Sequence, residues 1–280
     1  MATILRGKPV SDAILQKCGR VVSKRINESG LAPALACVSI GNNPSNNSYL
    51  KSISKKAQET GVIIKNYTLN DDVNTDFVID KIKELNNKKT IHGILLLKPF
   101  NAKSYLDVET ISQSIDPKKD VDCSTWLNSS SAYLNVNGYS PCTAEACIEI
   151  LNFYNIDLQG KDVCIIGRSH IVGRPLSQLA LNKNATVTVC HTKTKDISKH
   201  TKKADIVFVA TGTPNKFDSK YFTKGQVVVD AGINWDTKQN KLVGDVDFNS
   251  VENVVDAITP VPGGVGIVTT SVLLKHVVGC

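Results

Sequence analysis

The stretch GKDVCIIGRSHIVGRPLSQLALNKNATVTVC, residues 160–190, contains the strongest indication of the architecture. It joins an apolar run typical of a buried strand, a turn with a glycine at each end, a helix-forming segment and a second apolar run. This order is the unit from which nucleotide-binding parallel sheets are built. Gly167 and Gly173 enclose the turn, which does not match G-x-G-x-x-G. Its place between a strand and a helix favours nucleotide binding over a turn that serves packing alone.

The residues after this stretch continue the same alternation. Strand-like runs occur at ADIVFVATGTP, residues 204–214, and at GQVVVDAGIN, residues 225–234, and a last helix is expected near Thr269–His276. Strands that alternate with helices pair in parallel. The second half therefore predicts a Rossmann-like, doubly wound parallel sheet.

The first half contains a separate series of alternating elements. Apolar runs of strand length lie at ALACVSIG, VIIKNYTL and IHGILLLKP, with helical periodicity between them. We therefore predict an α/β protein made of two α/β domains with a cleft between them. Residues 1–137 form the first domain and residues 138–267 the second, and the C-terminal helix, residues 268–280, packs back on the first.

Composition and charge exclude several classes of function. The chain has 280 residues, 41% of them hydrophobic, which is enough for the cores of two domains. Its 33 basic and 26 acidic residues give a net charge of +7, but the lysines are spread along the chain, which argues against nucleic-acid binding. The first ten residues lack the build of a secretory signal, and no apolar run reaches the roughly 18 residues of a membrane span. We expect a cytoplasmic protein with no membrane partner.

The eight cysteines indicate neither a disulfide framework nor a metal site. Cys142, Cys147, Cys164 and Cys190 lie in apolar or strand-like runs without a repeated spacing, so reduced core thiols are expected. No pair has the C-x-x-C spacing of a zinc site, and His191 beside Cys190 is interpreted as a strand-end residue. We predict no metal.

The end of the second strand in the nucleotide-binding unit bears on the choice of cofactor. NAD-selective sites usually have an acidic residue there to bind the ribose 2′-hydroxyl. Here the run TVTVC is followed by His191, Thr192, Lys193, Thr194 and Lys195, with Arg168 in the turn before the helix. Hydroxyls and cations suit a 2′-phosphate, so NADP is favoured over NAD.

Six motifs occur in the second half in the order GRSHIVGRP, NATVTVCH, ADIVFVATG, VVVDAGIN, LVGDVDF and TPVPGGVG. In this order and spacing they resemble the bifunctional methylenetetrahydrofolate dehydrogenase/methenyltetrahydrofolate cyclohydrolase family of one-carbon metabolism. The likeness extends over essentially the whole chain, because IGNNP, Tyr49, GILLLKP, KDVD and PCT stand where that family has its folate-site segments. The resemblance implies a homodimer that acts on tetrahydrofolate derivatives.

The resemblance also implies where the ligands bind. The cofactor-binding positions are Gly167, Arg168, Ser169, Ile171, Gly173, His191, Thr192, Thr211, Gly212, Gly232, Ile233, Pro262, Gly263 and Gly264, and the substrate-binding positions are Tyr49, Asp122, Pro260, Gly264 and Thr269. Tyr49 is expected to stack on the pterin and Asp122 to hydrogen-bond its amino edge, and these two are the catalytic candidates. Taken alone, Tyr49 would be an ordinary half-buried helix tyrosine and Asp122 a turn residue.

Two catalytic positions depart from the family pattern. The family has a lysine four residues after the tyrosine and a glutamine in the strand G-I-L-V-Q-x-P, whereas this chain has Ile53 and Leu97. Cys123 also replaces the glycine of D-V-D-G, and Ile267 and Val268 replace a Pro-Met pair.

The substitutions affect the two chemical steps differently. Hydrolysis of the methenyl bridge needs a group that deprotonates water, and Ile53 cannot do so. Losing the lysine alone would strand the glutamine amide at a cost of roughly 1 to 3 kcal/mol, whereas replacing both groups by apolar ones is nearly neutral. Hydride transfer mainly requires that two ligands be held in contact. We predict NADP-dependent oxidation of 5,10-methylenetetrahydrofolate to the methenyl compound, with the cyclohydrolase step weak or lost.

Two alternatives remain open. A fully bifunctional enzyme requires another residue, such as Lys56 or Lys98, to take the role of the lysine. A catalytically silent folate or nucleotide binder would agree with the changes at Ile53, Leu97 and the Pro-Met position.

Overall fold

A computed structural model describes residues 1–136, 138–237 and 240–280. The chain divides into two compact units. Unit 1 contains residues 1–11 and 141–269, and unit 2 contains residues 12–140 and 270–280. Two helices belong to both units, because α1 (Gly7–Ser29) and α10 (Val265–Val278) each begin in unit 1 and end in unit 2.

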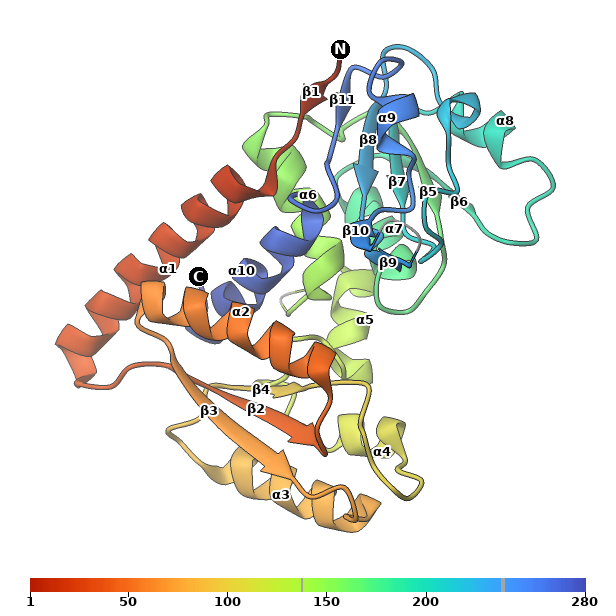
Figure 1. The fold of residues 1–280 in the computed structure, drawn as a ribbon. Coiled ribbons are helices and arrows are strands. Elements are labelled where there is room, and N and C mark those ends of the chain that lie inside the picture. Colours follow the sequence, from red (N-terminus) through yellow and green to blue (C-terminus); the bar gives the residue numbers. More distant parts are fainter. Residues whose placement is uncertain (137, 238–239) are drawn as a thin grey trace. The chain divides into compact units, whose positions relative to one another are not determined.

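Unit 1 is built on a parallel sheet of six strands (Figure 1). The strands are β1 (Thr3–Ile4), β5 (Asp162–Ile166), β6 (Thr186–Cys190), β7 (Ile206–Val209), β8 (Val227–Asp230) and β11 (Ala257–Ile258), in the order β1-β11-β8-β7-β5-β6. The chain runs from β5 outward to the edge strand β6 and then returns to the other side of β5 as β7. This reversal of direction is the switch point of a doubly wound sheet, where ligands bind at the carboxyl ends of the strands.

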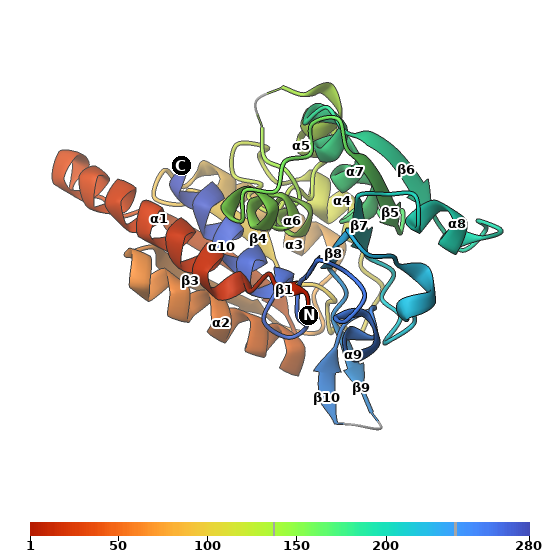
Figure 2. The ribbon, with the colours of Figure 1, turned by 90° about the horizontal axis from the view of Figure 1, so that it is seen from above.

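The helices of unit 1 are α6 (Cys142–Phe153), α7 (Gly173–Asn182), α8 (Ile197–Thr201) and α9 (Phe248–Val251), with the short 3-10 helix η1 (Ser219–Tyr221). Strands β9 (Asn234–Asp236) and β10 (Lys241–Val243) form an antiparallel hairpin that projects from this unit (Figure 2). The core lies between sheet and helices, where Val207, Val209 and Val228 pack with Phe217 and Val251. Buried strands of this kind carry continuous apolar runs, because both faces of the sheet are covered.

Unit 2 is built on a parallel sheet of three strands, β3 (Ile63–Leu69), β2 (Ala34–Ile40) and β4 (Gly93–Leu96), in that order. Helix α2 (Pro44–Thr60) covers one face and α3 (Thr75–Asn87) the other (Figure 1). Helices α4 (Val108–Gln113) and α5 (Trp126–Leu134) follow.

The two faces of the small sheet have separate sets of side chains. Ala34, Ala36, Val38 and Ile40 of β2, with Ile94 and Leu96 of β4, pack against Val78, Ile82 and Leu85 of α3. Because side chains alternate along a strand, the intervening residues face α2. The same alternation determines the direction of Leu97, which follows β4.

These two sheets confirm the predicted α/β class and the doubly wound parallel sheet. The division of the chain differs at its start from the predicted one, because β1 pairs with β11 and brings residues 1–11 into unit 1. A strand of two residues is too short to produce a periodic pattern in the sequence. Asn137, the predicted boundary, lies outside the described residues.

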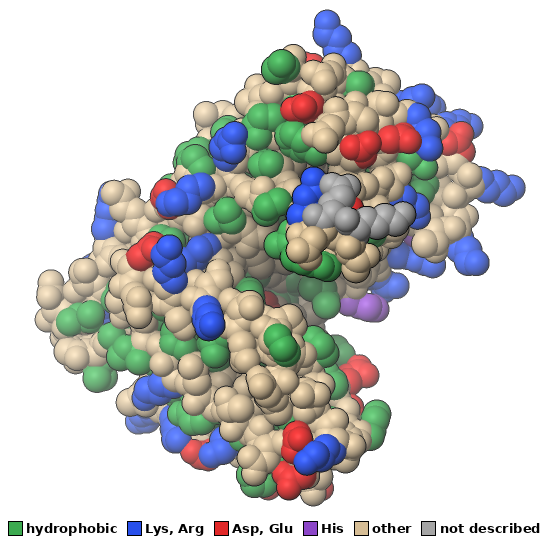
Figure 3. Space-filling view, viewed as in Figure 1, with side chains coloured by type: hydrophobic (Ala, Val, Ile, Leu, Met, Phe, Trp, Pro, Cys, Tyr) green, Lys and Arg blue, Asp and Glu red, His purple; other side chains and the backbone are tan. Residues whose placement is uncertain are grey.

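The folded chain also shows where the cysteines, the apolar helices and the basic residues lie. Seven of the eight cysteines are buried, and Cys280 is half-buried. Among the described residues, no helix is long and apolar enough to cross a membrane. On the face shown in Figure 3, lysines and arginines are scattered among neutral and acidic side chains.

Candidate functional site

The predicted cofactor-binding residues of unit 1 lie in loops that share one edge of the six-stranded sheet. These loops follow β5 (Gly167–Gly173), β6 (His191, Thr192), β7 (Thr211, Gly212), β8 (Gly232, Ile233) and β11 (Pro260–Gly264). All five strands are parallel, so their carboxyl ends lie at the same edge. The structure therefore brings together residues that are up to 97 positions apart, from Gly167 to Gly264.

The two glycines of the first loop are required by close backbone contacts. Gly167 has a φ of 127°, and a Cβ atom there would lie 2.1 Å from the carbonyl oxygen of Ala210. A Cβ on Gly173 would lie 2.2 Å from the carbonyl oxygen of Gly167. Side chains cannot be accommodated at such distances. The turn thus packs directly against the loop after β7, and α7 begins at its end.

The rim of this loop is polar and open to solvent. Arg168, Ser169 and Ile171 are exposed, and Thr192 is exposed beyond the end of β6. The first carboxylate after β6, Asp196, caps α8, where it accepts hydrogen bonds from Ser198 Oγ at 2.7 Å and from the Lys199 backbone. The nearest acidic group after β6 therefore already serves a structural role.

The loop after β11 is held against the start of α1. The Gly7 N–H donates to the Gly263 carbonyl oxygen at 2.7 Å, and a Cβ on Gly7 would lie 2.2 Å from the Gly264 carbonyl oxygen. A cavity of about 420 Å³ beside this loop is lined by Asp230, Gly244 and residues 259–262, among others. This part of unit 1 combines a constrained backbone with a buried carboxylate.

Two buried carboxylates of unit 1 were not among the predicted site residues. Asp230 ends β8 and is 2% exposed, and Asp245 follows β10 and is 0% exposed. Both belong to motifs that carried the family resemblance, VVVDAGIN and LVGDVDF, and an acidic residue inside an apolar motif was the available indication. Asp230 accepts backbone hydrogen bonds from Gly232 at 2.8 Å and Val246 at 2.8 Å. Burial nevertheless raises the pKa of Asp230 to about 7, and the nearby Asp245 adds to the effect.

In unit 2, α2 places Tyr49 and Ile53 over the small sheet. The Asn43 side chain caps the helix by accepting from the Ser45 N–H at 3.0 Å. The Asn46 amide nitrogen donates to the carbonyl oxygens of Leu97 at 3.1 Å and Pro99 at 3.0 Å. The first turn of α2 is thereby tied to the chain that leaves β4. Tyr49, one turn before Ile53, is half-buried.

The two positions that depart from the family pattern are both buried and apolar. Ile53 is 0% exposed and Leu97 is 3% exposed. Ile94 and Leu96 face α3, so Leu97 is on the opposite face of the strand, which α2 covers. The side chains of Ile53 and Leu97 therefore occupy the same side of the sheet, and an apolar pair there leaves no polar atom to be satisfied.

The two alternative lysines, Lys56 and Lys98, lie in different surroundings. The Lys56 ammonium donates to Thr270 Oγ1 and to Ser271 Oγ, the latter at 3.0 Å, and both acceptors belong to α10. Lys98 is exposed in the bend that follows β4. The described geometry thus directs the Lys56 ammonium to α10.

The segment that carries Asp122 runs alongside β4. Ile94 and Asp120 form a parallel bridge, and the Val121 carbonyl oxygen lies 2.7 Å from Nδ1 of His276 on α10. Asp120 is fully buried in this segment, whereas Asp122 is half-buried. Of the two carboxylates in the motif KDVD, Asp120 is therefore enclosed by protein and Asp122 is partly open to solvent.

Cys123 stands where the resemblance predicts a glycine, and its backbone conformation is one that favours glycine. Its φ of 58° is in the left-handed region, which glycine adopts without steric cost. The Cys123 thiol contacts the Tyr139 carbonyl oxygen at 3.3 Å and is buried.

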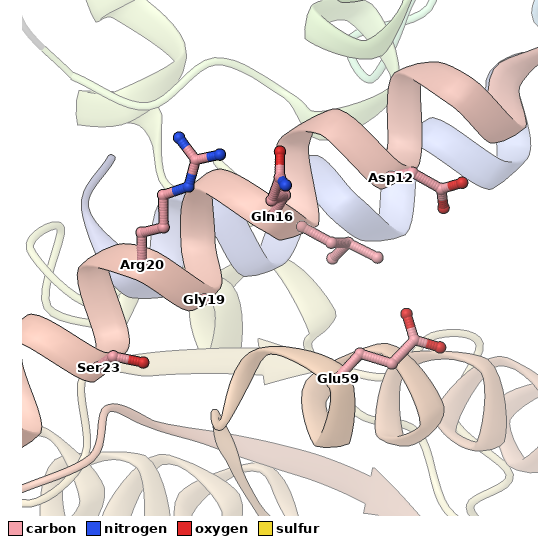
Figure 4. Close-up of a pocket in the computed structure, with 7 residues that line it drawn as sticks. Asp12, Gln16, Gly19, Arg20, Ser23 and Glu59 are labelled. Atoms are coloured by element: carbon pink, nitrogen blue, oxygen red, sulfur yellow. The ribbon is translucent and has the colours of Figure 1, made fainter.

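A separate groove lies between α1 and α2 in unit 2 (Figure 4). It has a volume of about 700 Å³ and is lined by Asp12, Leu15, Gln16, Gly19, Arg20, Ser23 and Glu59. None of the predicted site residues lines it, and its charged side chains are exposed. The groove is therefore distinct from the candidate site. Within the described part of the chain, no group of three or more His, Cys, Asp or Glu side chains is arranged to hold a metal ion.

Comparisons with known proteins match both halves of the chain to the same family. The tetrahydrofolate dehydrogenase/cyclohydrolase catalytic domain matches residues 5–122, and the NAD(P)-binding domain of the same family matches residues 141–280. The bifunctional protein FolD of Clostridium botulinum is 44% identical over 279 residues, covering 99% of this chain and 98% of that protein.

Solved structures of similar proteins give the same result. The bifunctional FolD methylenetetrahydrofolate dehydrogenase/cyclohydrolase of Campylobacter jejuni superimposes with a TM-score of 0.95 at 38% identity, covering 100% of this chain and 98% of that one. The Trypanosoma brucei methylenetetrahydrofolate dehydrogenase-cyclohydrolase, solved with NADP cofactor and an inhibitor, has a TM-score of 0.91 at 30% identity, covering 99% and 96% of the chains.

The buried carboxyl of Asp230 predicts a pH-dependent stability. Its pKa is raised in the folded protein, so its favourable contribution is complete below the unfolded pKa of about 4 and is lost as pH rises through about 7. We expect Asp230→Asn to abolish a loss of about 3 kcal/mol in unfolding free energy between pH 5 and pH 8. Urea unfolding at both pH values measures this loss. The exposed Asp256→Asn variant should keep the wild-type pH dependence, and identical slopes for Asp230→Asn and wild type would contradict the assignment.

Proposed function

This chain belongs to the tetrahydrofolate dehydrogenase/cyclohydrolase family, and on that basis we propose that it oxidises 5,10-methylenetetrahydrofolate with NADP and has little or no cyclohydrolase activity. Membership of the family makes it an enzyme of tetrahydrofolate metabolism with an NAD(P)-binding domain. The choice of NADP and the loss of the second step are the proposal. One observation carries it, namely the buried apolar pair Ile53 and Leu97 at the positions of the family's lysine and glutamine.

The oxidation requires little acid or base chemistry from the protein. A hydride leaves the methylene bridge of the folate, the folate nitrogen lone pairs stabilise the resulting cation, and the nicotinamide accepts the hydride. The chain's task is to hold the two ligands in reacting geometry. We assign the pterin to Tyr49 by stacking and to Asp122 by hydrogen bonding, with Pro260, Gly264 and Thr269 as further substrate-binding residues.

Hydrolysis of the methenyl product makes a demand that these residues do not meet. A water molecule must lose a proton as it attacks the bridge carbon, and a lysine with a lowered pKa suits this task. Ile53 has no titratable group, and Lys56 is engaged with Thr270 and Ser271. Loss of both polar side chains also leaves no stranded amide, so the pair is compatible with a stable fold.

The dinucleotide site supports NADP by its charge. Arg168 is exposed on the turn after β5, and Thr192, Lys193 and Lys195 are exposed after β6. A 2′-phosphate would be attracted by these cations, whereas the first carboxylate after β6, Asp196, caps α8. The glycine turn lies between β5 and α7, where a pyrophosphate is bound in doubly wound folds, and its tight path depends on Gly167 and Gly173.

A fully bifunctional enzyme is the alternative that the names of the relatives favour. It would require Lys56 to leave its α10 partners and act on water. A silent binder is the second alternative, because several folate-site positions have changed.

A spectrophotometric assay separates these three possibilities. Methylenetetrahydrofolate with NADP should yield NADPH and an equal amount of the methenyl compound, which then decays no faster than in buffer. Prompt loss of added methenyl compound would support the bifunctional enzyme. Absence of NADPH under conditions in which the protein binds NADP would support the silent binder.

Restoring the two polar side chains should restore hydrolysis. We expect Ile53→Lys with Leu97→Gln to accelerate loss of the methenyl compound by at least about tenfold, because burial lowers the pKa of the new lysine. The single variant Leu97→Gln adds an amide without a lysine partner, so we expect it not to hydrolyse the methenyl compound. Lys56→Met is the control for a relocated base and should leave hydrolysis at the buffer rate. A drop in hydrolysis on this change would refute the proposal.

Arg168 should distinguish the two dinucleotides. Arg168→Ala is expected to raise KM for NADP by about tenfold or more and to change KM for NAD by less than about twofold, because only NADP has the 2′-phosphate. Steady-state kinetics with both cofactors measures this difference. Lys183→Ala, which removes an exposed cation at the other end of α7, is the matched control. Equal changes for NAD and NADP would contradict the assignment.

A further inference from the structure

The loop after β7 is held by one buried carboxylate. Gly212 and Thr213 are exposed and Thr211 is half-buried, so core packing contributes little to the loop's conformation. Oδ2 of Asp245 accepts hydrogen bonds from the backbone N–H groups of Thr211 and Gly212, the latter at 2.9 Å, and from Thr211 Oγ1 at 3.0 Å. Oδ1 accepts from the Thr213 N–H at 2.9 Å. Three successive N–H groups therefore converge on a single side chain.

The same carboxylate reaches the segment after β8. Its Oδ1 also accepts from the Asn234 side-chain amide at 2.8 Å. Asn234 follows Gly232 and Ile233, so the loops after β7 and β8 are joined through Asp245. A Cβ on Gly232 would lie 2.3 Å from Oδ1 of Asp245, which shows how closely this backbone approaches the carboxylate.

Asp230 extends the connection to a third loop. Its Oδ1 accepts from the Asp245 N–H at 3.2 Å, which places Asp245 relative to the end of β8. The Asp230 N–H donates to Thr259 Oγ1 at 2.8 Å, and Thr259 directly precedes the loop Pro260–Gly264. The loops after β7, β8 and β11 thus share one buried hydrogen-bond network.

Stability alone does not account for this arrangement. A buried carboxylate carries a desolvation cost that hydrogen bonds only offset, and apolar residues of similar volume are often as stable or more so. Carboxylate acceptors do, however, fix backbone donors in one geometry, because charge-assisted hydrogen bonds are short and directional. The network acts on exposed loops at the carboxyl edge of the sheet, where a dinucleotide binds in doubly wound folds.

We propose that Asp245 is a positioning residue for the dinucleotide: it clamps the loops after β7 and β8 in the conformation that receives the cofactor. The inference rests on the proposed function, in which these loops bind NADP through Thr211, Gly212, Gly232 and Ile233. Asp245 acts through the backbone of Thr211–Thr213 and through Asn234, and it does not itself contact the ligand.

Asp245→Asn tests the clamp with almost no change in volume. The amide has one oxygen and one NH2 group, whereas the carboxylate has two acceptor oxygens. The NH2 group must face either the N–H groups of Thr211 and Gly212 or that of Thr213, so one half of the clamp is lost. We expect Kd and KM for NADP to rise about tenfold or more and kcat to change less than about threefold, because the loop binds the cofactor equally in ground and transition states. Asp256→Asn removes an exposed carboxylate that accepts from the Gly225 N–H, and it should leave Kd and KM unchanged.

Exchanging the two side chains provides a rescue. In Asp245→Asn with Asn234→Asp, the carboxylate moved to position 234 accepts from the amide moved to position 245. The oxygen of that amide then faces the Thr211 and Gly212 N–H groups. The exchanged pair should recover at least about a third of the affinity that Asp245→Asn loses. Asn234→Ala, which deletes one donor and keeps the carboxylate, should raise Kd by about threefold and remains informative if Asp245→Asn does not fold.

Calorimetric titration with NADP and with NAD keeps this inference separate from the proposed function, because binding is measured without turnover. A wild-type protein that binds a dinucleotide but forms no NADPH would refute the proposed activity and leave the clamp to be judged by Kd. The clamp would be overturned if both Asp245→Asn and Asn234→Ala bound NADP with the wild-type Kd, whatever their melting temperatures. A fall in kcat without a change in Kd for NADP would also overturn it.

Discussion

The close contact between backbone segments at the switch point of the six-stranded sheet underlies the whole nucleotide-binding unit. Gly167 lies against the carbonyl of Ala210, and Gly173 against the carbonyl of Gly167, at distances that exclude any side chain. The loops after β5 and β7 can therefore pack directly on each other, and α7 can begin directly at the end of the turn. The remaining loops at this edge are arranged around that contact, because the strands that carry them are in register with β5 and β7.

The loops farther along the edge are organised by charge rather than by steric contact. Asp245 accepts hydrogen bonds from the N–H groups of the exposed Gly212 and Thr213, and Asp230 accepts one from the N–H of Val246 in the core. Burial of two acidic groups is unfavourable, which is reflected in the raised pKa of Asp230. A glycine contact and a carboxylate network thus have the same effect, which is to give an exposed loop one conformation.

Unit 2 fills the space beside its candidate folate residues with apolar side chains. The Asn46 amide attaches α2 to the end of β4, and Ile53 and Leu97 lie between helix and strand. This pair leaves Tyr49 and Asp122 as the polar groups assigned to the pterin, while the Lys56 ammonium is held on α10. A site of this kind is suited to positioning a folate and lacks a base at the family's lysine position. The packing of one helix on one strand is thereby connected with the proposed restriction to hydride transfer.

The α/β class, the doubly wound sheet and the family could all be predicted from the residues alone, because apolar periodicity and glycine positions are local properties of the chain. Ile53 and Leu97 could be located in the same way, since fixed spacing from Tyr49 and Gly93 suffices. Three features became visible only in the folded chain: residues 1–11 join unit 1, Lys56 bonds to α10, and two buried aspartates link three loops. These features depend on groups brought together from distant parts of the chain. Residue spacing along the sequence does not specify which donors will bond to a buried carboxylate, nor which acceptors will bond to a lysine ammonium.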